Sequence, residues 1–501
     1  MIIWGISAGA DNAALTVMQD QTVVFASTAD RFSGVLGDRL LNQNLVSYAL
    51  NWGEPDYITF YERPWLRLAR QLRAAQFSEL AHPYSVQDQL TKFGVTARRS
   101  FYYTDHQLAH ASAYYHSGFT DAAVIVLDTV GEFASSSVWL GTGRQLKRRW
   151  SQSYPQSVGL FYSAMVDRCG LVAGQDELTF MGLAGQGDYR KYYTLIKQDL
   201  IQWRRYPRPK IQLRYNLHRG CRWWRADITD VENIAAAVQK IYEEILFDIA
   251  LYARGISNTK NLVITGDTAR LASANAILAR RELFENIYIP PSPGDAGASL
   301  GSILAHSRRP IELKNNLLGY PIEGAYPQAE ALARLLAGKP VAIANGAAEF
   351  GDQTVGNRSI LIDPRLVDSR EQINRIKGRN TWETYCPAIL AEHAEQYYKV
   401  SANRSAYSHF TAKAQGDLYP SIVHPDGTSK LQVITPDANP NFYQLLSEWY
   451  RATGYPILLN TGLDSPGKPM VNNLVQAEQF GREHGIDILV NDQTIIAATV
   501  E

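Results

Sequence analysis

The chain has 501 residues, which is enough for about two to four domains with well-filled cores and excludes a single small module. Lysine plus arginine and aspartate plus glutamate both number 49, so no net charge attracts the whole protein to nucleic acid, a membrane surface or a basic partner. Hydrophobic residues make up 46% and charged residues 20%, which is the balance of a folded globular protein.

The N-terminus predicts a strand at 2–7, a loop of glycine and aspartate at 9–12, and two further strands at 13–18 and 22–26, separated by a turn. Residues 122–150 repeat this order of strand, loop, strand, turn and strand. The repeat predicts a duplicated α/β domain. Because ligands bind at the carboxyl ends of strands in open α/β sheets, we expect Asp11 and Asp128 to face one shared cleft.

Residues 231–252 predict a long amphipathic helix, since apolar residues recur there every three or four positions. After residue 305 the sequence becomes polar and rich in proline, and a new strand signal begins at 340–344. Apolar runs at 359–362, 432–435 and 456–459 indicate a second, smaller α/β domain with its own core. We therefore expect two domains, at 1–320 and 327–501.

The three cysteines, Cys169, Cys221 and Cys386, are odd in number and too far apart for a CxxC metal site. They indicate no disulfide framework and favour a reducing cytoplasm. The first residues lack a basic segment before an apolar run, and no apolar run reaches about 18 residues. We expect a cytoplasmic protein without a signal peptide, a membrane span or a membrane partner.

Two histidines give the most specific local signal. Asp105 is a candidate helix N-cap, and His106 and His110 lie four residues apart on one face of the helix that would follow. Two imidazoles one turn apart bind a single cation, and Asp128 from a nearby strand end would complete a mixed nitrogen and oxygen site for iron, manganese or zinc. The alternative is that both histidines are surface or packing residues, as such pairs often are.

Glycine and aspartate also lie together at 265–268, after a predicted strand at 261–264, and at 293–301, before a helical run. Glycine permits close approach of a ligand to the backbone, and helix N-terminal amides bind phosphate. Asp295 is a further candidate cation ligand. Each segment alone also fits an ordinary glycine-rich turn, but together these strand-to-loop junctions predict a nucleotide cleft.

Seven motifs span nearly the whole chain: DHQLAH at 105–110, SVGLFYSA at 157–164, FMGLA at 180–184, GDAG at 294–297, GNRSILIDPR at 356–365, HPDGT at 424–428 and LNT at 459–461. In this order they resemble the motifs of O-carbamoyltransferases of the nodulation and antibiotic-tailoring type. The resemblance implies an N-terminal actin-like ATPase (ribonuclease H-like) domain, similar to the tRNA threonylcarbamoyl-transfer subunit. It also implies a C-terminal domain similar to threonylcarbamoyl-adenylate synthase.

The resemblance implies that the C-terminal domain forms carbamoyl-adenylate from ATP and carbamoyl phosphate, and that the N-terminal domain passes the carbamoyl group to an acceptor hydroxyl. By position, the family's metal ligands match His106, His110, Asp128 and Asp295, a donor set that favours iron over manganese, zinc or magnesium. We expect catalytic roles for Asp11 and His110. Binding of nucleotide or carbamoyl donor is expected of Gly266, Asp267, Asn275, Gly294, Gly297, Arg358, Lys377, Arg379, Lys430, Asn460 and Lys468.

The chain also departs from the family pattern. Gln353, Glu383, Lys430 and Pro466 stand where the family has arginines, and Ala10 stands where it has a histidine. Arginine binds phosphate through a bidentate fork that glutamine and proline lack. These replacements imply an altered donor or acceptor pocket, or a weakened first half-reaction.

Residues 203–225 contain eight basic residues and no acidic residue, interleaved with aromatic residues. Because cations bind phosphates and rings stack on bases, the segment predicts a site for a single or distorted nucleic-acid strand, formed by Trp203, Arg204, Arg205, Arg208, Arg222, Trp223, Trp224 and Arg225. A hydroxymethylated pyrimidine in DNA, or a nucleotide, would then be the acceptor. The alternative is a solvated arginine-rich hairpin that packs its tryptophans or covers the anionic adenylate.

We therefore expect an ATP-dependent O-carbamoyltransferase, either monomeric or oligomeric. The alternatives are a non-catalytic relative that binds nucleotide or nucleic acid, threonylcarbamoyl transfer to tRNA adenosine, and carbamoylation of a small sugar or antibiotic. The fused adenylate-forming domain and the motif Asn357-Arg358-Ser359 favour carbamoyl over threonylcarbamoyl transfer. A cationic aminoglycoside would be repelled by the basic segment.

Overall fold

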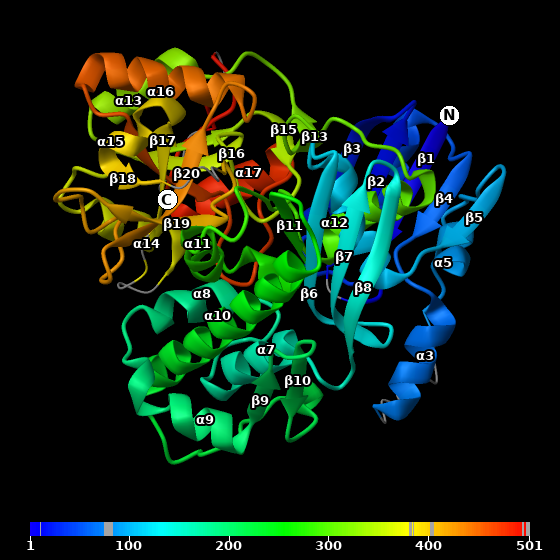
Figure 1. The fold of residues 1–501 in the computed structure, drawn as a ribbon. Coiled ribbons are helices and arrows are strands. Elements are labelled where there is room, and N and C mark those ends of the chain that lie inside the picture. Colours follow the sequence, from blue (N-terminus) through cyan, green and yellow to red (C-terminus); the bar gives the residue numbers. More distant parts are fainter. Residues whose placement is uncertain are drawn as a thin grey trace. The chain divides into compact units, whose positions relative to one another are not determined.

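A computed structural model describes residues 1–10, 12–74, 84–379, 383, 385–400, 405–492 and 495–496. The chain divides into two compact units (Figure 1): unit 1 comprises Met1–Ala29 and Asp38–Leu313, and unit 2 comprises Asp30–Gly37 and Lys314–Glu501. Both units are α/β, as predicted from the sequence. Asp11 lies outside the described residues, so its catalytic role and its place beside Asp128 stay predictions.

Unit 1 contains two five-stranded sheets. Sheet A has the order β3-β2-β1-β4-β5, formed by β1 Ile2–Ser7, β2 Ala14–Gln19, β3 Thr22–Thr28, β4 Tyr57–Phe60 and β5 Ser100–Tyr103. Sheet B has the order β8-β7-β6-β11-β12, formed by β6 Asp121–Gly131, β7 Ala134–Thr142, β8 Gln145–Ser153, β11 Asn261–Thr265 and β12 Asn286–Tyr288.

The two sheets share one topology. In each, the first three strands of the chain are antiparallel neighbours, and the last two continue the sheet in parallel with the first strand. The predicted duplication of an α/β domain is therefore confirmed. The carboxyl ends of β1, β4, β6 and β11 are the edges at which such sheets bind ligands.

Helices cover both faces of sheet B. Alternate residues of β7 point to opposite faces: Ser137 donates a hydrogen bond to Gln107 of α6 (His106–Ala111), whereas Val138 lies beside Trp150, whose ring faces Tyr252. Tyr252 belongs to α10 (Val231–Gly255), which confirms the long helix predicted there. Because both faces are covered, β6 is buried from residue 122 to 128.

A second helix, α12 (Asp295–Ser307), contacts both α6 and strands β1, β2 and β4 of sheet A. Gly301 permits this packing, because a β-carbon there would lie 2.0 Å from the carbonyl oxygen of Ala109 in α6. The pair of helices thus brings residues 106–111 and 295–307 together between the two sheets.

The remaining helices of unit 1 are α2 Gln43–Ala49, α3 Pro64–Arg73, α5 Val86–Lys92, α7 Val158–Arg168, α8 Glu177–Ala184, α9 Tyr193–Asp199 and α11 Ala272–Arg280. A two-stranded hairpin, β9 Ile201–Arg204 and β10 Lys210–Leu213, lies between α9 and α10 in the chain. Within the described ranges, no helix has the length and apolar character needed to cross a membrane.

Unit 2 is built on a mixed sheet in the order β18-β19-β20-β17-β21-β16-β14-β22-β23. Its strands are β14 Val341–Ala344, β16 Arg358–Ile362, β17 Cys386–Leu390, β18 Tyr398–Lys399, β19 Phe410–Ala414, β20 Thr428–Ile434, β21 Ile457–Gly462, β22 Ile488–Leu489 and β23 Ile495–Ile496. The predicted strands at 340–344, 359–362, 432–435 and 456–459 correspond to β14, β16, β20 and β21.

A separate pair, β13 Leu317–Ile322 and β15 Gly346–Glu349, completes the strands of unit 2. Its helices are α1 Asp30–Ser33, α13 Gln328–Leu336, α14 Ser369–Lys377, α15 Ala394–Tyr397, α16 Pro440–Thr453 and α17 Leu474–His484. Apolar side chains from both faces of the large sheet pack in two clusters, which gives the unit its own core.

Candidate metal centre

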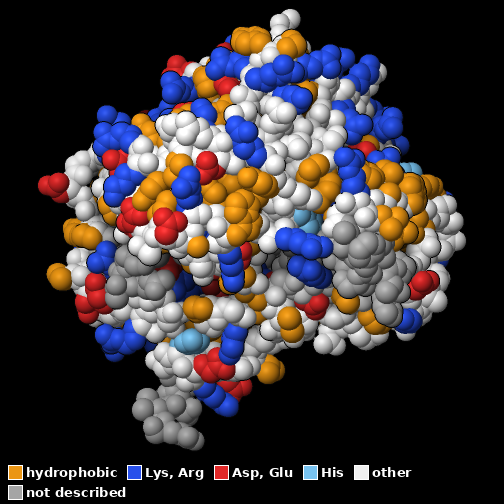
Figure 2. Space-filling view, turned by 90° about the horizontal axis from the view of Figure 1, so that it is seen from below, with side chains coloured by type: hydrophobic (Ala, Val, Ile, Leu, Met, Phe, Trp, Pro, Cys, Tyr) orange, Lys and Arg blue, Asp and Glu red, His pale blue; other side chains and the backbone are white. Residues whose placement is uncertain are grey.

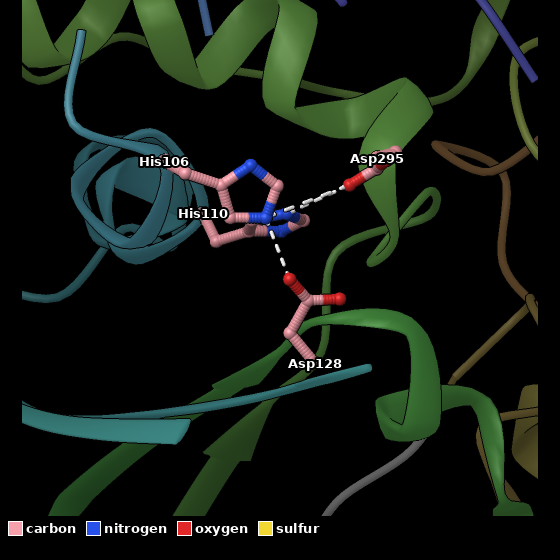
Figure 3. A group of neighbouring side chains, drawn as sticks. All are labelled: His106, His110, Asp128 and Asp295. Carbon is pink, nitrogen blue, oxygen red and sulfur yellow. Dashed lines mark hydrogen bonds and ion pairs between the residues drawn. The ribbon is translucent and has the colours of Figure 1, made fainter. Parts of the chain in front are cut away.

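The four predicted metal ligands converge in unit 1 (Figure 3). His106 and His110 project from α6, Asp128 lies near the end of β6, and Asp295 is the first residue of α12. One ligand atom of each side chain lies within 4.8 Å of the others, and no side chain is more than 8% exposed. The sequence motifs therefore identified residues that the fold brings together from three separate segments.

The start of α6 explains why both imidazoles point the same way. The carboxylate of Asp105 accepts a hydrogen bond of 3.0 Å from the backbone N–H of Leu108, which confirms the predicted N-cap. With the helix fixed at this residue, His106 and His110 lie one turn apart, and their ring centroids are 4.8 Å from each other.

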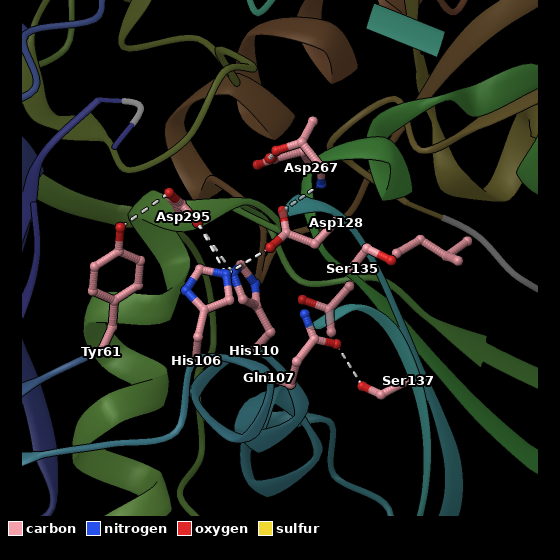
Figure 4. Close-up of polar contacts among 12 residues, drawn as sticks. Tyr61, His106, Gln107, His110, Asp128, Ser135, Ser137, Asp267 and Asp295 are labelled. Atoms are coloured by element: carbon pink, nitrogen blue, oxygen red, sulfur yellow. Dashed lines mark hydrogen bonds and ion pairs between the residues drawn. The ribbon is translucent and has the colours of Figure 1, made fainter. Parts of the chain in front are cut away.

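Each carboxylate presents one oxygen to an imidazole and has the other held by a second group. Nε2 of His106 is 2.6 Å from Oδ2 of Asp128, whose Oδ1 accepts the N–H of Thr129 at 2.8 Å. Nε2 of His110 is 3.2 Å from Oδ1 of Asp295, whose Oδ2 accepts the hydroxyl of Tyr61 at 3.3 Å (Figure 4). Such outer contacts fix the orientation of metal ligands.

The electrostatics of the cluster favour positive charge. Burial alone would lower the pKa of His106, but the carboxylates of Asp128 and Asp295 outweigh burial and raise this pKa to about 10. Burial would raise the pKa of Asp128, yet the imidazoles hold it well below its usual range. Burial raises the pKa of Tyr61, so its hydroxyl keeps the proton that it donates to Asp295.

These residues fit a divalent cation. Both Nδ1 atoms are buried without a hydrogen-bond partner in the described part of the chain, so each imidazole offers only Nε2 to the cluster. Metal ligation needs both imidazoles in their neutral form. The two buried carboxylates would then carry uncompensated negative charge, and a divalent ion bound by two nitrogens and two oxygens removes that cost.

The comparisons with known proteins address the chemistry. Residues 17–304 match the family described as carbamoyltransferase N-terminus, and residues 332–498 match the family described as carbamoyltransferase C-terminus. The chain belongs to the carbamoyltransferase family. The resemblance drawn from the seven sequence motifs is thereby confirmed, and so is the expectation that this is an enzyme.

Two relatives of this carbamoyltransferase cover most of its length. Uncharacterized protein sll1178 of Synechocystis sp. is 27% identical and covers 100% of this chain and 97% of its own. Nodulation protein NolNO of Sinorhizobium fredii is 26% identical, over 93% of this chain and 76% of its own. Among solved structures, component A of (R)-2-hydroxyglutaryl-CoA dehydratase from Acidaminococcus fermentans is 12% identical, with a TM-score of 0.31, and covers 62% of this chain and 99% of its own.

Two residues that the sequence analysis did not select hold the carbamoyltransferase's α6 in place. The guanidinium of Arg63 pairs with the Asp105 cap at 2.6 Å and with Glu132 at 2.5 Å, and the backbone N–H of Arg63 donates to Glu132 at 2.7 Å. Arg63 thus connects the start of α3, the cap of α6 and the turn between β6 and β7. Arg63 follows closely after the apolar strand β4, and this position near a strand end is the sequence signal that could have selected it.

Part of the predicted nucleotide loops lies beside the metal centre. Gly266, with φ +95°, packs against the carbonyl of Leu127, and the Asp267 carboxylate accepts the hydroxyl of Thr129 at 3.1 Å. A β-carbon on Gly294, the N-cap of α12, would lie 2.7 Å from Oδ1 of Asp267. These three predicted residues therefore share one neighbourhood with Asp128 and Asp295.

The other two predicted nucleotide residues in unit 1 have structural contacts. Gly297 lies in the first turn of α12, where a β-carbon would be 1.8 Å from the carbonyl of Ser292. Asn275 is buried in α11, and its Nδ2 donates to the carbonyl of Ala269 at 2.7 Å. Their roles toward a nucleotide stay predictions.

In unit 2, two of the predicted donor residues meet at one carboxylate. Lys377 is buried, and its Nζ donates to the carbonyl of Gly462 and to Oδ1 of Asp464, both at 2.7 Å. Arg379 pairs with the other oxygen of Asp464 at 3.3 Å. Burial lowers the pKa of Lys377 to about 8, although Asp464 acts in the opposite direction.

The remaining donor candidates are not gathered at that carboxylate. Arg358 is fully buried, with its guanidinium donating to the backbone carbonyls of Tyr320, Asn345, Gly346, Asn357 and Asn472. Asn460 is buried and donates to Thr354 and Gln432, whereas Lys430 is half-buried on β20 and Lys468 is exposed beside Glu483. Their contacts with a donor stay predictions.

The basic segment at 203–225 obtains acidic partners from elsewhere in unit 1. Asp248 pairs with Arg205 at 2.6 Å and accepts from Nε1 of Trp203, and Asp167 pairs with Arg222 at 2.7 Å. Asp199 accepts from Nε1 of the buried Trp224 and pairs with Arg225. Arg204, Arg208 and Trp223 remain exposed.

Proposed function

We propose that this carbamoyltransferase forms carbamoyl-adenylate from ATP and carbamoyl phosphate and transfers the carbamoyl group to an acceptor hydroxyl. The observation that carries the proposal is the buried convergence of His106, His110, Asp128 and Asp295 next to the loops that contain Gly266, Asp267 and Gly294. Such a cluster beside backbone-lined loops suits a phosphate-bearing ligand and a cation. We assign transfer to residues 1–320 and adenylate formation to residues 327–501.

The resident metal in this proposal is iron, with manganese, zinc and magnesium as alternatives. Two imidazole nitrogens and two carboxylate oxygens favour a transition ion, because magnesium prefers an all-oxygen shell that retains waters. When bound, such an ion polarises the carbonyl or phosphoryl oxygen of the adenylate as a Lewis acid. Metal analysis of the purified protein identifies the ion. Less than one tightly bound equivalent of any divalent metal per chain would contradict the proposed metal centre.

The chain's own groups position the reactants. Tyr61 keeps its proton on the hydroxyl and holds Oδ2 of Asp295, so Oδ1 stays directed to the histidines. The N-terminus of α12 carries no side-chain cap, and its partial positive charge favours a phosphate there. We assign the proton transfer from the acceptor hydroxyl to Asp11, and the catalytic role of His110 is to hold the metal through Nε2.

In unit 2, we propose that Lys377 and Arg379 offset the phosphate charge of the donor. Asp464 orients both cations through the two oxygens of its carboxylate. The acceptor is an alcohol, and a hydroxymethyl pyrimidine in DNA or a nucleotide is the class that the basic, aromatic segment supports.

The experiment is turnover of the purified, metal-loaded enzyme. With ATP and carbamoyl phosphate the wild type should release pyrophosphate, and with an acceptor alcohol the product should gain one carbamoyl group by mass spectrometry. A threonylcarbamoyl adduct would contradict the assigned donor. Absence of pyrophosphate release with iron, manganese, zinc and magnesium would favour a non-catalytic binding protein.

A further inference from the structure

The hairpin β9–β10 presents like charges to solvent. Arg204 lies directly opposite Lys210 in the antiparallel register, with Gln202 opposite Gln212 on the same outer face. Like charges directly across a sheet destabilise it. Neither cation pairs with a carboxylate among the residues that the structure describes. No acidic side chain of the described fold therefore offsets the repulsion between Arg204 and Lys210.

The other face of the hairpin is anchored. Ile201, Ile211 and Leu213 are buried, and Nε1 of Trp150 on β8 donates to the carbonyl of Pro209 at 2.8 Å. Gln152, also on β8, accepts the N–H of Ile211 at 3.0 Å. The outward side chains of the hairpin are thus held on a rigid support rather than on a free loop.

Exposed aromatic rings lie in the same segment of the chain as these cations. Tyr206 is 76% exposed at the hairpin tip, and Tyr215 and Trp223 are 52% and 57% exposed, with their ring centroids 5.0 Å apart. Arg208 adds a further exposed cation at the tip of the hairpin. Figure 2 shows lysine and arginine side chains interspersed with hydrophobic ones on the face of the molecule that it draws.

We propose that this hairpin surface, defined as Arg204, Tyr206, Arg208, Lys210, Tyr215 and Trp223, binds a single-stranded nucleic acid. Cations on the outer face bind backbone phosphates, and exposed rings stack on unpaired bases. A lipid surface fits less well, because a membrane-binding element buries a continuous apolar face that includes leucine or phenylalanine, whereas the leucines and isoleucines at 201–217 are buried in the fold.

Helix α7 connects this surface to the metal centre. At its start, Ser157 donates hydrogen bonds to the carbonyls of Asp128 and Thr129, and at its end Arg168 donates to the carbonyls of Trp224 and Ile228. Eleven residues of α-helix span about 16 Å. The backbone beside Trp223 thus lies about one helix length from the backbone of Asp128.

The role of this nucleic acid as the carrier of the acceptor hydroxyl rests on the proposed function, whereas the binding itself does not. The test uses fluorescence anisotropy of the full chain with a fluorescein-labelled oligothymidylate of about 20 nucleotides, over a range of salt concentrations. The wild type should bind it more tightly than the matching duplex. Its affinity should fall with salt, with a slope of about −0.7 per phosphate contact.

The decisive variant is Arg204→Gln/Lys210→Gln, because neither side chain supports the fold through a described ion pair. It should bind at least tenfold more weakly and reduce the salt slope by about 1.4, the value for two lost phosphate contacts. Trp223→Ala should weaken binding at least fivefold and leave the slope unchanged, since stacking carries no charge. The matched control Lys92→Gln/Arg98→Gln removes two exposed cations elsewhere in unit 1 and should bind as the wild type does.

Three outcomes would overturn the proposal: no binding of the oligonucleotide, an equal loss in the control variant, or binding to phosphatidylglycerol vesicles without binding to the oligonucleotide. His110→Ala should still bind the oligonucleotide while it loses carbamoyl transfer. A wild type that binds DNA but releases no pyrophosphate would therefore remove the proposed reaction alone, and the reverse result would remove the surface alone.

Discussion

Gly131 lies directly against the imidazole of His106. A β-carbon built on Gly131 would be 1.8 Å from Cδ2 of that ring, whereas real β-carbons essentially never approach a neighbour within 3.0 Å. The missing side chain at the end of β6 therefore leaves the space that the ring occupies. This contact fixes the position from which Nε2 of His106 reaches Asp128 at 2.6 Å.

Gly131→Ala should displace His106 without straining the backbone, because Gly131 does not have a positive φ. Since displaced supporting contacts typically weaken metal sites by about 10–100-fold, we expect at least a tenfold loss of metal affinity and a parallel loss of carbamoyl transfer. Calorimetric titration with manganese measures the affinity. Gly255→Ala is the control, as a β-carbon there meets no atom within 4 Å; equal affinities in both variants would contradict the arrangement.

Arg63→Gln tests whether the network around the Asp105 cap supports the metal centre. The variant loses the ion pairs to Asp105 and Glu132, so α6 should be less well fixed and metal affinity should fall about tenfold. Glu132→Gln keeps a side-chain oxygen that accepts the backbone N–H of Arg63, so Arg63→Gln/Glu132→Gln should bind metal no more weakly than Arg63→Gln. Fully additive losses would show that the two residues act separately, and Arg98→Gln, a surface ion-pair variant, is the control.

His110→Ala removes a nitrogen ligand from the centre. Metal binding should weaken more than about 100-fold and transfer should be lost, while the unmetallated protein should keep its unfolding temperature within a few degrees. A saturating metal stabilises only a fold that binds it, so added manganese should raise the unfolding temperature of the wild type and not that of the variant. The control is His306→Ala at the exposed end of α12. A variant that remains stabilised by metal would exclude His110 as a ligand.

The sequence predicted the parts of the fold that local patterns encode. Buried strands such as β1 and β6 are continuous apolar runs, and α10 has a clear helical period. Strands β4 and β5 were not predicted, because β4 joins sheet A by pairing with β1, about fifty residues earlier in the chain, and β5 joins it by pairing with β4, about forty residues earlier. Local composition contains no information on such pairing.

The candidate metal centre shows the same limit on what local sequence patterns can predict. The candidate ligands His106, His110 and Asp295 were found because they lie in motifs, and Asp128 because it ends an apolar strand, although His110 and Asp295 are 185 positions apart. Arg63 and Gly131 were missed because their roles depend on which side chains they meet in space. The prediction for the basic segment at 203–225 used only the residues of that segment. Its acidic partners come from three other elements: Asp167, Asp199 and Asp248.

His116 allows a prediction about stability and pH. It is buried at the end of the 3₁₀ turn Ser112–His116, with Nδ1 2.9 Å from the hydroxyl of Tyr288, and burial lowers its pKa to about 4. In the unfolded chain a histidine titrates near pH 6.5, at about the usual value. Between these two values the unfolded chain binds a proton that the folded chain does not, so the free energy of unfolding falls as the pH is lowered.

Through His116, the free energy of unfolding should fall by about 1.4 kcal/mol for each pH unit below about 6.5. This decrease should level off near pH 4, where the folded chain also takes up the proton. His116→Asn keeps a polar side chain next to Tyr288 but cannot titrate. Urea unfolding between about pH 7.5 and 4.5 should therefore show the wild type losing stability faster than the variant. A constant difference between the two proteins across this range would mean that His116 is protonated in both states or in neither.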